Sequence, residues 1–264
     1  SIFYLSGSTR QQQYELFHSG TRRIGELAPD FDFNREQKIQ YVCSTMKQAY
    51  VNKQAVSEFV KGIRYPLYFL DFEMFMPAVP IYDGTSPYEH IPFLYSLHSK
   101  MNIESVLSHT GFLAETGAHP MREFIERLIK DLGNEGDILI FDPTHEQKIL
   151  NKAIQLFPDL REALQNILLR IIDLSTPFRK KDYYLTSMKG SYSMKFLLPA
   201  IAPELSFDTL SIQNGIAALA AYENLQKEED LFKSLEIREA LMDYCKMDTL
   251  GLVKIFEALE RVEA

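Results

Sequence analysis

Two acidic residues interrupt the apolar segment 68–75, YFLDFEMF, and this pair constrains the fold more than any other feature of the sequence. Side chains alternate between the two faces of a strand, so Asp71 and Glu73 point the same way, with Cα atoms about 7 Å apart. Burying a bare carboxylate is costly unless it is paired or bound to a metal ion. We therefore expect a hard divalent cation, Mg²⁺ or Mn²⁺, between them. An edge strand with both acids facing solvent is the alternative, which the apolar flanks make weaker.

A third carboxylate lies on the apolar face of a helix near the C-terminus. The apolar residues that recur there at helical spacing are Ile237, Leu241, Tyr244, Cys245, Leu252, Ile255, Phe256 and Leu259. Asp248 falls in the middle of this stripe, one turn after Tyr244, whereas Asp243 points elsewhere and is expected to be solvated. Tyr244 and Asp248 thus share one helix face. Their spacing is common by itself, and its value comes from combination with Asp71 and Glu73.

Length and composition exclude several classes of protein. A chain of 264 residues, 46 % of them hydrophobic, can bury a sizeable core. It contains no run of about 18 apolar residues, so we expect no membrane span, and no secretory signal is visible. The two cysteines, Cys43 and Cys245, lack the spacing of zinc ligands and are typical of a protein in the reducing cytoplasm.

Basic residues gather in one segment although the net charge of the chain is −8, which argues mildly against a nucleic-acid binder. Residues 178–195 hold five basic residues and one acid, interleaved with four aromatic residues. Cations neutralise phosphates and rings stack on bases, as a single-strand channel requires. The candidates for binding a strand are Arg179, Lys180, Lys181, Lys189, Tyr192 and Lys195. A solvated loop whose tyrosines pack on the core is nearly as good an interpretation of any one of them.

From residue 65 onward, segments of strand and helix pattern alternate. The expected strands are 66–75, 92–100, 103–108, 137–141 and 170–174, and the expected helices are 121–132, 146–157 and 160–169. Three antiparallel strands followed by alternating helices and strands predict an α/β fold with a mixed sheet flanked by helices. Residues 1–60 are polar and mostly helical in pattern. We therefore expect an N-terminal helical extension, 1–62, and a main domain, 63–264.

The Asp-x-Glu motif at Asp71 and Glu73, a middle acidic motif and the Tyr-x-x-x-Asp motif at Tyr244 and Asp248 resemble those of the DEDD exonuclease superfamily, in its tyrosine-bearing branch. The fold of that superfamily is ribonuclease H-like. Several segments are also similar to a bacterial family described as domain of unknown function 2779, DUF2779. They are 65–73 (YPLYFLDFE), 83–88 (DGTSPY), 91–93 (IPF), 190–195 (GSYSMK) and 244–249 (YCKMDT). The similarity runs from about Tyr65 to the C-terminus. Met74 and Leu94 depart from the family pattern, but neither is an expected metal ligand.

The resemblance implies a fourth acid just after a strand, at the start of a helix. The Phe-Glu pair of the family aligns with His145 and Glu146, so Glu146 is the expected residue. Asp142 is the alternative, since it ends the strand and could simply cap the helix. The resemblance further implies that Asp71, Glu73, Glu146 and Asp248 hold two divalent ions, Mg²⁺ or Mn²⁺. Tyr244 would orient the attacking water.

The implied activity is 3′-to-5′ hydrolysis of single-stranded DNA or RNA to nucleoside 5′-monophosphates by a two-metal mechanism. A catalytically weak or inactive module, which binds nucleic acid or acts as a scaffold in a larger bacterial DNA-processing protein, is the alternative from another class. A structure-specific endonuclease is a third possibility. The resemblance also implies an upstream domain of the same full-length protein. Nothing in the sequence separates DNA from RNA, because contacts to the 2′-hydroxyl depend on geometry.

Overall fold

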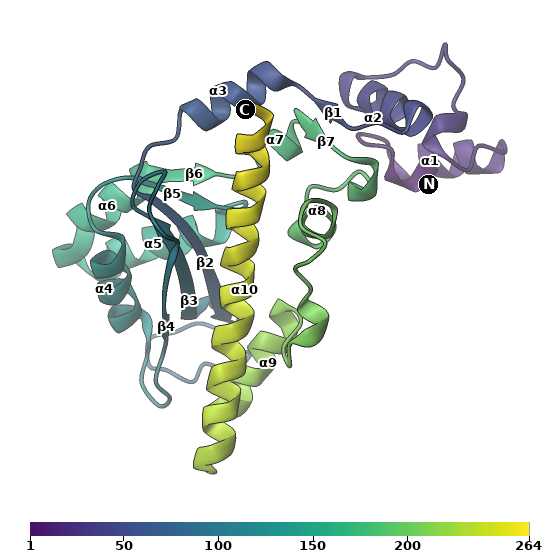
Figure 1. Cartoon of the computed structure of the whole chain (residues 1–264). Helices are drawn as coiled ribbons and strands as arrows, with labels where there is room; N and C mark the ends of the chain where they lie inside the picture. Colours follow the sequence, from purple (N-terminus) through teal and green to yellow (C-terminus); the bar gives the residue numbers. More distant parts are fainter. Residues whose placement is uncertain (264) are drawn as a thin grey trace. The chain divides into compact units, whose positions relative to one another are not determined.

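The computed structural model describes residues 1–263, which divide into two compact units (Figure 1). The first unit combines Ser1–Ile63, Ser175–Glu204 and the end of the chain from Lys254, and the second combines Arg64–Leu174 and Leu205–Val253. The sequence prediction divides the chain into an N-terminal extension, 1–62, and a main domain, 63–264. A boundary does fall after residue 63, but two later segments group with the N-terminal residues.

The second unit is built on a five-stranded mixed sheet. Its strands are β2 (Leu67–Phe75), β3 (Ile91–Lys100), β4 (Ser108–Leu113), β5 (Asp137–Ile140) and β6 (Ile171–Asp173). Their order is β4-β3-β2-β5-β6, in which β4, β3 and β2 are antiparallel neighbours while β5 runs parallel to β2 and to β6. The mixed α/β class that the sequence predicts is confirmed.

Helices cover both faces of this sheet. They are α4 (Met121–Leu132), α5 (Thr144–Leu156), α6 (Arg161–Arg170), α9 (Gly215–Leu225) and α10 (Leu231–Glu263), with short 3-10 turns η3 (Pro158–Leu160) and η5 (Phe207–Thr209). One core packs α4, α5 and α6 against Leu70 and Phe72 of β2. The other core packs α9 and α10 against Phe75 of β2 and Phe93 of β3. Figure 1 shows α10 on the side of the sheet opposite α4 and α5.

The central strand β2 is paired along both edges only over its first residues. Its partner β5 is in register with Leu67, Tyr68 and Phe69 and extends no further along β2, whereas β3 pairs with the whole length of the strand. A register shift interrupts the β2–β3 ladder between Glu73 and Met74. The strand therefore leaves one edge open at the point where its acidic residues begin.

The third predicted strand is misplaced by several residues. Strand β4 spans Ser108–Leu113 rather than 103–108. The segment before it is a turn, in which the backbone N–H of Ser105 donates to the Asn102 carbonyl at 3.2 Å. Ile103 and Val106 are 70 % and 88 % exposed, so the apolar residues that suggested a strand do not face the core.

The first unit is mainly helical. Its elements are η1 (Ile2–Tyr4), α1 (Arg10–His18), η2 (Ile24–Glu26), α2 (Arg35–Met46), β1 (Tyr50–Val51), α3 (Lys53–Lys61), α7 (Thr176–Arg179), β7 (Tyr183–Tyr184), η4 (Thr186–Met188) and α8 (Met194–Ile201). Helices α1 and α2 each begin with a capping box, at Thr9 and Asn34. Strand β1 pairs antiparallel with β7, and Arg35 forms an ion pair with Asp182 at 2.8 Å. These long-range contacts explain why segment 175–204 belongs with the N-terminal residues.

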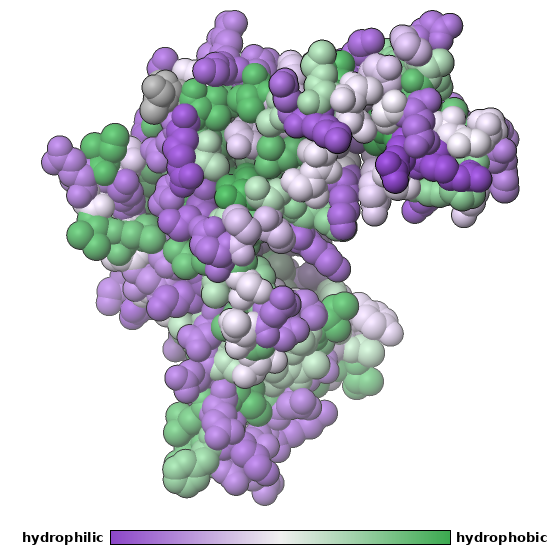
Figure 2. Space-filling view, turned by 45° about the vertical axis from the view of Figure 1, so that its right-hand side comes forward, coloured by the Kyte–Doolittle hydropathy of each residue, from purple (hydrophilic) through white to green (hydrophobic). Residues whose placement is uncertain are grey.

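The surface mixes polar and apolar residues. Figure 2 shows one face of the molecule, on which hydrophilic residues in purple are interspersed with smaller groups of hydrophobic residues in green. Leu231 and Phe232, at the start of α10, are 69 % and 77 % exposed. Within residues 1–263, no helix combines the length and the apolar character needed to cross a membrane.

Candidate metal centre

Three carboxylates converge on the face of the sheet that α10 covers. Ligand oxygens of Asp71, Glu73 and Asp248 all lie within 4.8 Å of one another, and each side chain keeps partial access to solvent. Asp71 and Glu73 alternate along β2 with the buried Leu70 and Phe72, which point to the opposite core. The sequence prediction that these acids share a site is consistent with this geometry.

Helix α10 packs closely on β2 at this point. The Cys245 Sγ atom lies 3.9 Å from both the backbone carbonyl and the Oδ2 atom of Asp71. Tyr244, only 7 % exposed, packs with Cys245 in the apolar core between α10 and the sheet. The helical spacing of the apolar stripe thus presents Tyr244 and Asp248 to the acids of β2.

A buried polar network fixes α10 against β3. The Thr249 hydroxyl lies 2.7 Å from the Ser96 hydroxyl and 2.8 Å from Nδ1 of His98, and Ser96 also contacts Nε2 of His109 at 2.9 Å. Ser96 is the β3 residue opposite Asp71. The sequence analysis did not assign these residues to the site. Their signal is the presence of Ser96 and His98 in an otherwise apolar strand.

Gly215, at the start of α9, is a further residue of the site that the sequence analysis did not identify. A Cβ atom at this position would lie 3.8 Å from Oε2 of Glu73 and 3.9 Å from the Tyr244 hydroxyl. Asn214 caps the helix by accepting from the Ala217 backbone N–H at 3.0 Å. The lack of a side chain at Gly215 leaves space beside the carboxylate and the phenol.

Burial and mutual repulsion favour the protonated forms of these acids in the absence of a cation. Burial raises the pKa of Asp71 above its usual range. Burial, together with the nearby charges of Asp71 and Asp248, raises the pKa of Glu73, and burial with Asp71 raises that of Asp248. A hydrogen bond with Tyr244 partly opposes both of these last shifts. A bound cation would remove the repulsion between the ionised carboxylates.

The Tyr244 phenol is held in its neutral form. Burial, and then the charges of Asp248, Glu73 and Asp71, raise its pKa far above the usual range. A neutral hydroxyl can both donate and accept a hydrogen bond. It can therefore donate to a carboxylate while accepting from a water molecule.

Glu146 is a fourth acid, located on α5 just beyond the end of β5. It is 6 % exposed, and its Oε2 atom has no hydrogen-bond partner among the residues that the structure describes. Burial raises its pKa to about 8, with further contributions from the charges of Asp71 and Asp142. Glu146 lies outside the group of three converging acids, but its charge raises the pKa of Glu73, and the charge of Asp71 raises the pKa of Glu146.

Asp142 has a different environment from Glu146. Its backbone is left-handed, with φ of 57°, and its Oδ1 accepts from the Thr144 hydroxyl at 2.8 Å. Its backbone N–H donates to Oδ1 of Asp173 at 3.1 Å. These bonds belong to the turn that starts α5. Of the two alternatives, Glu146 is the one with a buried carboxylate oxygen that lacks a partner.

The residues of segment 178–195 that are predicted to bind a nucleic-acid strand all belong to the first unit. The candidate acids Asp71, Glu73, Glu146 and Asp248 belong to the second unit. Lys181 is only 6 % exposed, and its ammonium pairs with Glu36 at 2.8 Å. It is not a solvent-facing cation. The Lys189 ammonium lies 5.4 Å from the centre of the Phe196 ring, and Tyr192 is half-buried. The residues that are exposed are Arg179, Lys180, Lys189 and Lys195.

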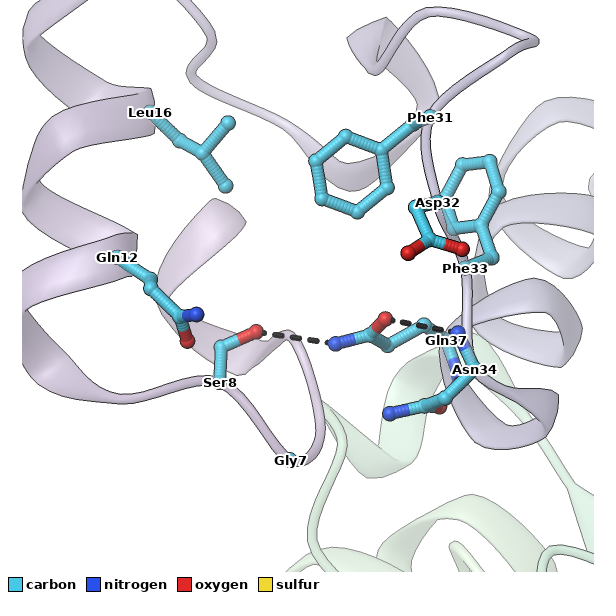
Figure 3. A pocket seen from close by; sticks show the side chains of 9 residues that line it. All are labelled: Gly7, Ser8, Gln12, Leu16, Phe31, Asp32, Phe33, Asn34 and Gln37. Carbon is cyan, nitrogen blue, oxygen red and sulfur yellow. Dashed lines mark hydrogen bonds between the residues drawn. The ribbon is translucent and has the colours of Figure 1, made fainter.

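A cavity of about 430 Å³ in the first unit contains none of the candidate acids (Figure 3). It lies between α1 and the segment that leads into α2, and Figure 3 shows amide and hydroxyl groups of Gln12, Ser8, Asn34 and Gln37 around it. Asp32 is its one acidic lining residue. A single exposed acid among amides and aromatic rings does not form a metal centre.

Residues 68–193 match the family model described as domain of unknown function, DUF2779. The matched segment includes Asp71, Glu73 and Glu146, and it ends before Tyr244 and Asp248. The DUF2779 resemblance is thereby supported over this part of the chain. No curated protein and no solved structure matches the chain.

Proposed function

We propose that this chain is a metal-dependent nuclease of the DEDD type, which hydrolyses single-stranded DNA or RNA from the 3′ end to nucleoside 5′-monophosphates. The observation that carries the proposal is the convergence of Asp71, Glu73 and Asp248 from segments far apart in the sequence. The order of three antiparallel strands followed by two parallel ones supports a ribonuclease H-like assignment for the second unit.

The donor set fits divalent cations that prefer oxygen. Three carboxylates within 4.8 Å of one another offer several hard ligands, and the unpartnered Oε2 atom of Glu146 is a further acceptor. Asp71, Glu73 and Asp248 would hold the ions, and Glu146 would complete the site. When bound, two Mg²⁺ or Mn²⁺ ions would activate a water and stabilise the departing 3′ oxygen.

The residues of the chain have separate tasks in this proposal. Asp71 would help to hold the ions together with Glu73 and Asp248, whose ligand oxygens lie within 4.8 Å of its own. Tyr244 would orient the attacking water, because its buried hydroxyl remains neutral and bonds to Asp248. Cys245 and Thr249, on the same helix, hold α10 at the distance from β2 and β3 that brings Asp248 to the site.

The experiment is a degradation assay with DNA and RNA strands labelled at the 5′ or the 3′ end, in Mg²⁺, in Mn²⁺ and in chelator. The test variant is Asp248→Asn, and its matched control is Asp243→Asn, an exposed acid on the same helix. We expect products shortened stepwise from the 3′ end in wild type and Asp243→Asn, and none in Asp248→Asn or in chelator.

Hydrolysis that survives in Asp248→Asn would place the chemistry elsewhere. Internal cleavage of a structured strand would indicate an endonuclease. Strand binding without hydrolysis in either metal would support a nucleic-acid-binding module instead.

A further inference from the structure

The second unit contains another group of titratable side chains outside the acidic site. A cavity of about 250 Å³ is lined by Glu89, His90, His145, Lys148, Ile149 and Lys152, and we call it the histidine pocket. Its volume lies just below the range of about 300–1,000 Å³ for pockets that hold drug-sized ligands. It therefore suits one small group rather than a large molecule.

Two segments build the histidine pocket. Four of its residues lie at positions i, i+3, i+4 and i+7 of α5, which form one face of a helix. The other two, Glu89 and His90, come directly before β3. The rings of His90 and His145 approach each other across the two segments, with centroids 5.5 Å apart and planes inclined by 35°.

The charges of the pocket favour an anion. Lys152 pairs with Glu89, so these two charges cancel. Lys148 is exposed, and among residues 1–263 its ammonium has no ion-pair or hydrogen-bond partner. Burial lowers the pKa of His90, and the charges of His145 and Lys148 lower it further.

A cation is a poorer occupant of the same pocket. Lys152 is neutralised by Glu89, but the ammonium of Lys148 would repel a metal ion. Within the described residues, the acids of β2 and α10 form the group that could hold a metal, and neither His90 nor His145 is part of it. The imidazole N–H groups and the ammonium are instead donors for the oxygens of an anion.

The pocket lies at the edge of the sheet that carries the acids. Strands β2 and β5 are parallel, so their C-terminal ends reach the same edge. His145 directly precedes Glu146 after β5. His90 directly precedes Ile91, which is opposite Phe75 at the end of β2. A nucleic-acid strand bound at the acids would thus have the histidine pocket, with the positive charge of Lys148, at the same end of the sheet.

We propose that the histidine pocket binds a phosphate group of the nucleic-acid strand whose 3′ end is hydrolysed at the acids, an inference that rests on the proposed function. Lys148 supplies a permanent positive charge, and His90 and His145 donate ring N–H bonds to the phosphate oxygens. A phosphodiester is an anion without donors of its own, and this pocket offers it the Lys148 ammonium and one ring N–H from each imidazole.

The test measures strand binding in chelator, so that hydrolysis plays no part. A fluorescent dT or rU oligonucleotide is titrated with the full chain at several salt concentrations, and the affinity is followed by anisotropy. The test variant is Lys148→Gln. Its control is Lys130→Gln, which removes an exposed lysine of α4 in the same unit. Melting temperatures of both variants establish that each is folded.

We expect Lys148→Gln to bind about tenfold more weakly, as for the loss of one charged hydrogen bond. The slope of log affinity against log salt should also become shallower by about 0.7, the value for one phosphate contact of a single strand. Lys130→Gln should bind like wild type. Equal affinities and slopes for the two variants would overturn the proposal.

A second measurement decides the case in which neither oligonucleotide binds. Imidazole NMR signals, assigned with His90→Asn and His145→Asn, are followed while inorganic phosphate is added. Unmoved signals overturn the pocket as a phosphate site, and signals that move without strand binding overturn its assignment to a nucleic-acid strand. A chain that hydrolyses strands but shows no effect of Lys148→Gln keeps the proposed function and loses the pocket. If Lys148→Gln weakens strand binding but the chain hydrolyses no strand, the pocket is kept as a phosphate site and the proposed function is lost.

Discussion

Replacing Glu146 by glutamine should make the metal-free chain more stable at alkaline pH. The folded chain keeps the proton of Glu146 up to a pKa of about 8, whereas the ordinary value for the unfolded chain is 4.5. Between these values the folded state binds more protons than the unfolded state, so stability falls as pH rises through this window. The full difference corresponds to roughly 5 kcal/mol at 1.36 kcal/mol per pKa unit.

The net gain in Glu146→Gln should be smaller than that upper value. A buried amide that lacks hydrogen-bond partners costs about 1–3 kcal/mol, and this cost does not depend on pH. We therefore expect Glu146→Gln to be less stable than wild type by about 1–3 kcal/mol at pH 4 and more stable by about 2–4 kcal/mol at pH 9. The difference between the two proteins, rather than either stability alone, carries the pH dependence of Glu146.

Urea unfolding in chelator at pH 4, 6, 8 and 9 measures this difference. The control is Asp142→Asn, because Asp142 bonds to Thr144 and lies in the turn before α5. This variant reports the effect of an amide in place of a carboxylate at the same end of α5. A Glu146→Gln difference that stays constant from pH 4 to pH 9 would refute the assignment of a raised pKa to this buried carboxyl. Added Mn²⁺ should raise the stability of wild type at pH 8 and should raise that of Glu146→Gln by a smaller amount.

Three further outcomes are expected. Tyr244→Phe should lower kcat and kcat/KM together by about 10²–10⁴-fold with metal affinity unchanged, and an unaltered kcat in single-turnover assays would reduce Tyr244 to a packing residue. Asp71→Ala and Asp248→Ala should abolish hydrolysis yet melt no lower than wild type in chelator, and a large fall in melting temperature would mark them as structural residues. Thr249→Val should cost about 1–3 kcal/mol in chemical unfolding because two buried partners lose their bond, whereas Thr249→Ser should cost less; equal losses would assign the effect to packing.

The sequence predicts strand β2, which carries Asp71 and Glu73, and helix α4 well, because each has a strong local period. Strand β2 spans Leu67–Phe75 against a predicted 66–75, and α4 spans Met121–Leu132 as predicted. The spacing of apolar residues in these elements follows from which face is buried. The β4 prediction was wrong because Ile103 and Val106 have strand-forming side chains but lie in an exposed turn.

The grouping of the chain into units depends on contacts that have no local signal. Tyr50 pairs with Tyr184 across more than a hundred residues, and Lys181 reaches back to Glu36. The pattern of basic and aromatic residues in 178–195 does not distinguish a lysine that faces solvent from one that pairs with a carboxylate on a distant helix. The sequence therefore identifies candidate cations, and only the fold decides that Lys181 is already paired.

The acidic site illustrates the same distinction between a residue and its partners. Asp71 and Asp248 are visible in the sequence because each is a carboxylate at an apolar position. Ser96 and Thr249 are ordinary small polar residues, and their importance arises only because the fold places them 2.7 Å apart in a buried contact between β3 and α10. Charges that repel one another cannot hold two elements together in the absence of a cation. The neutral network of Ser96, His98 and Thr249 can hold them together, and it keeps Asp248 close to the acids of β2 in the metal-free chain.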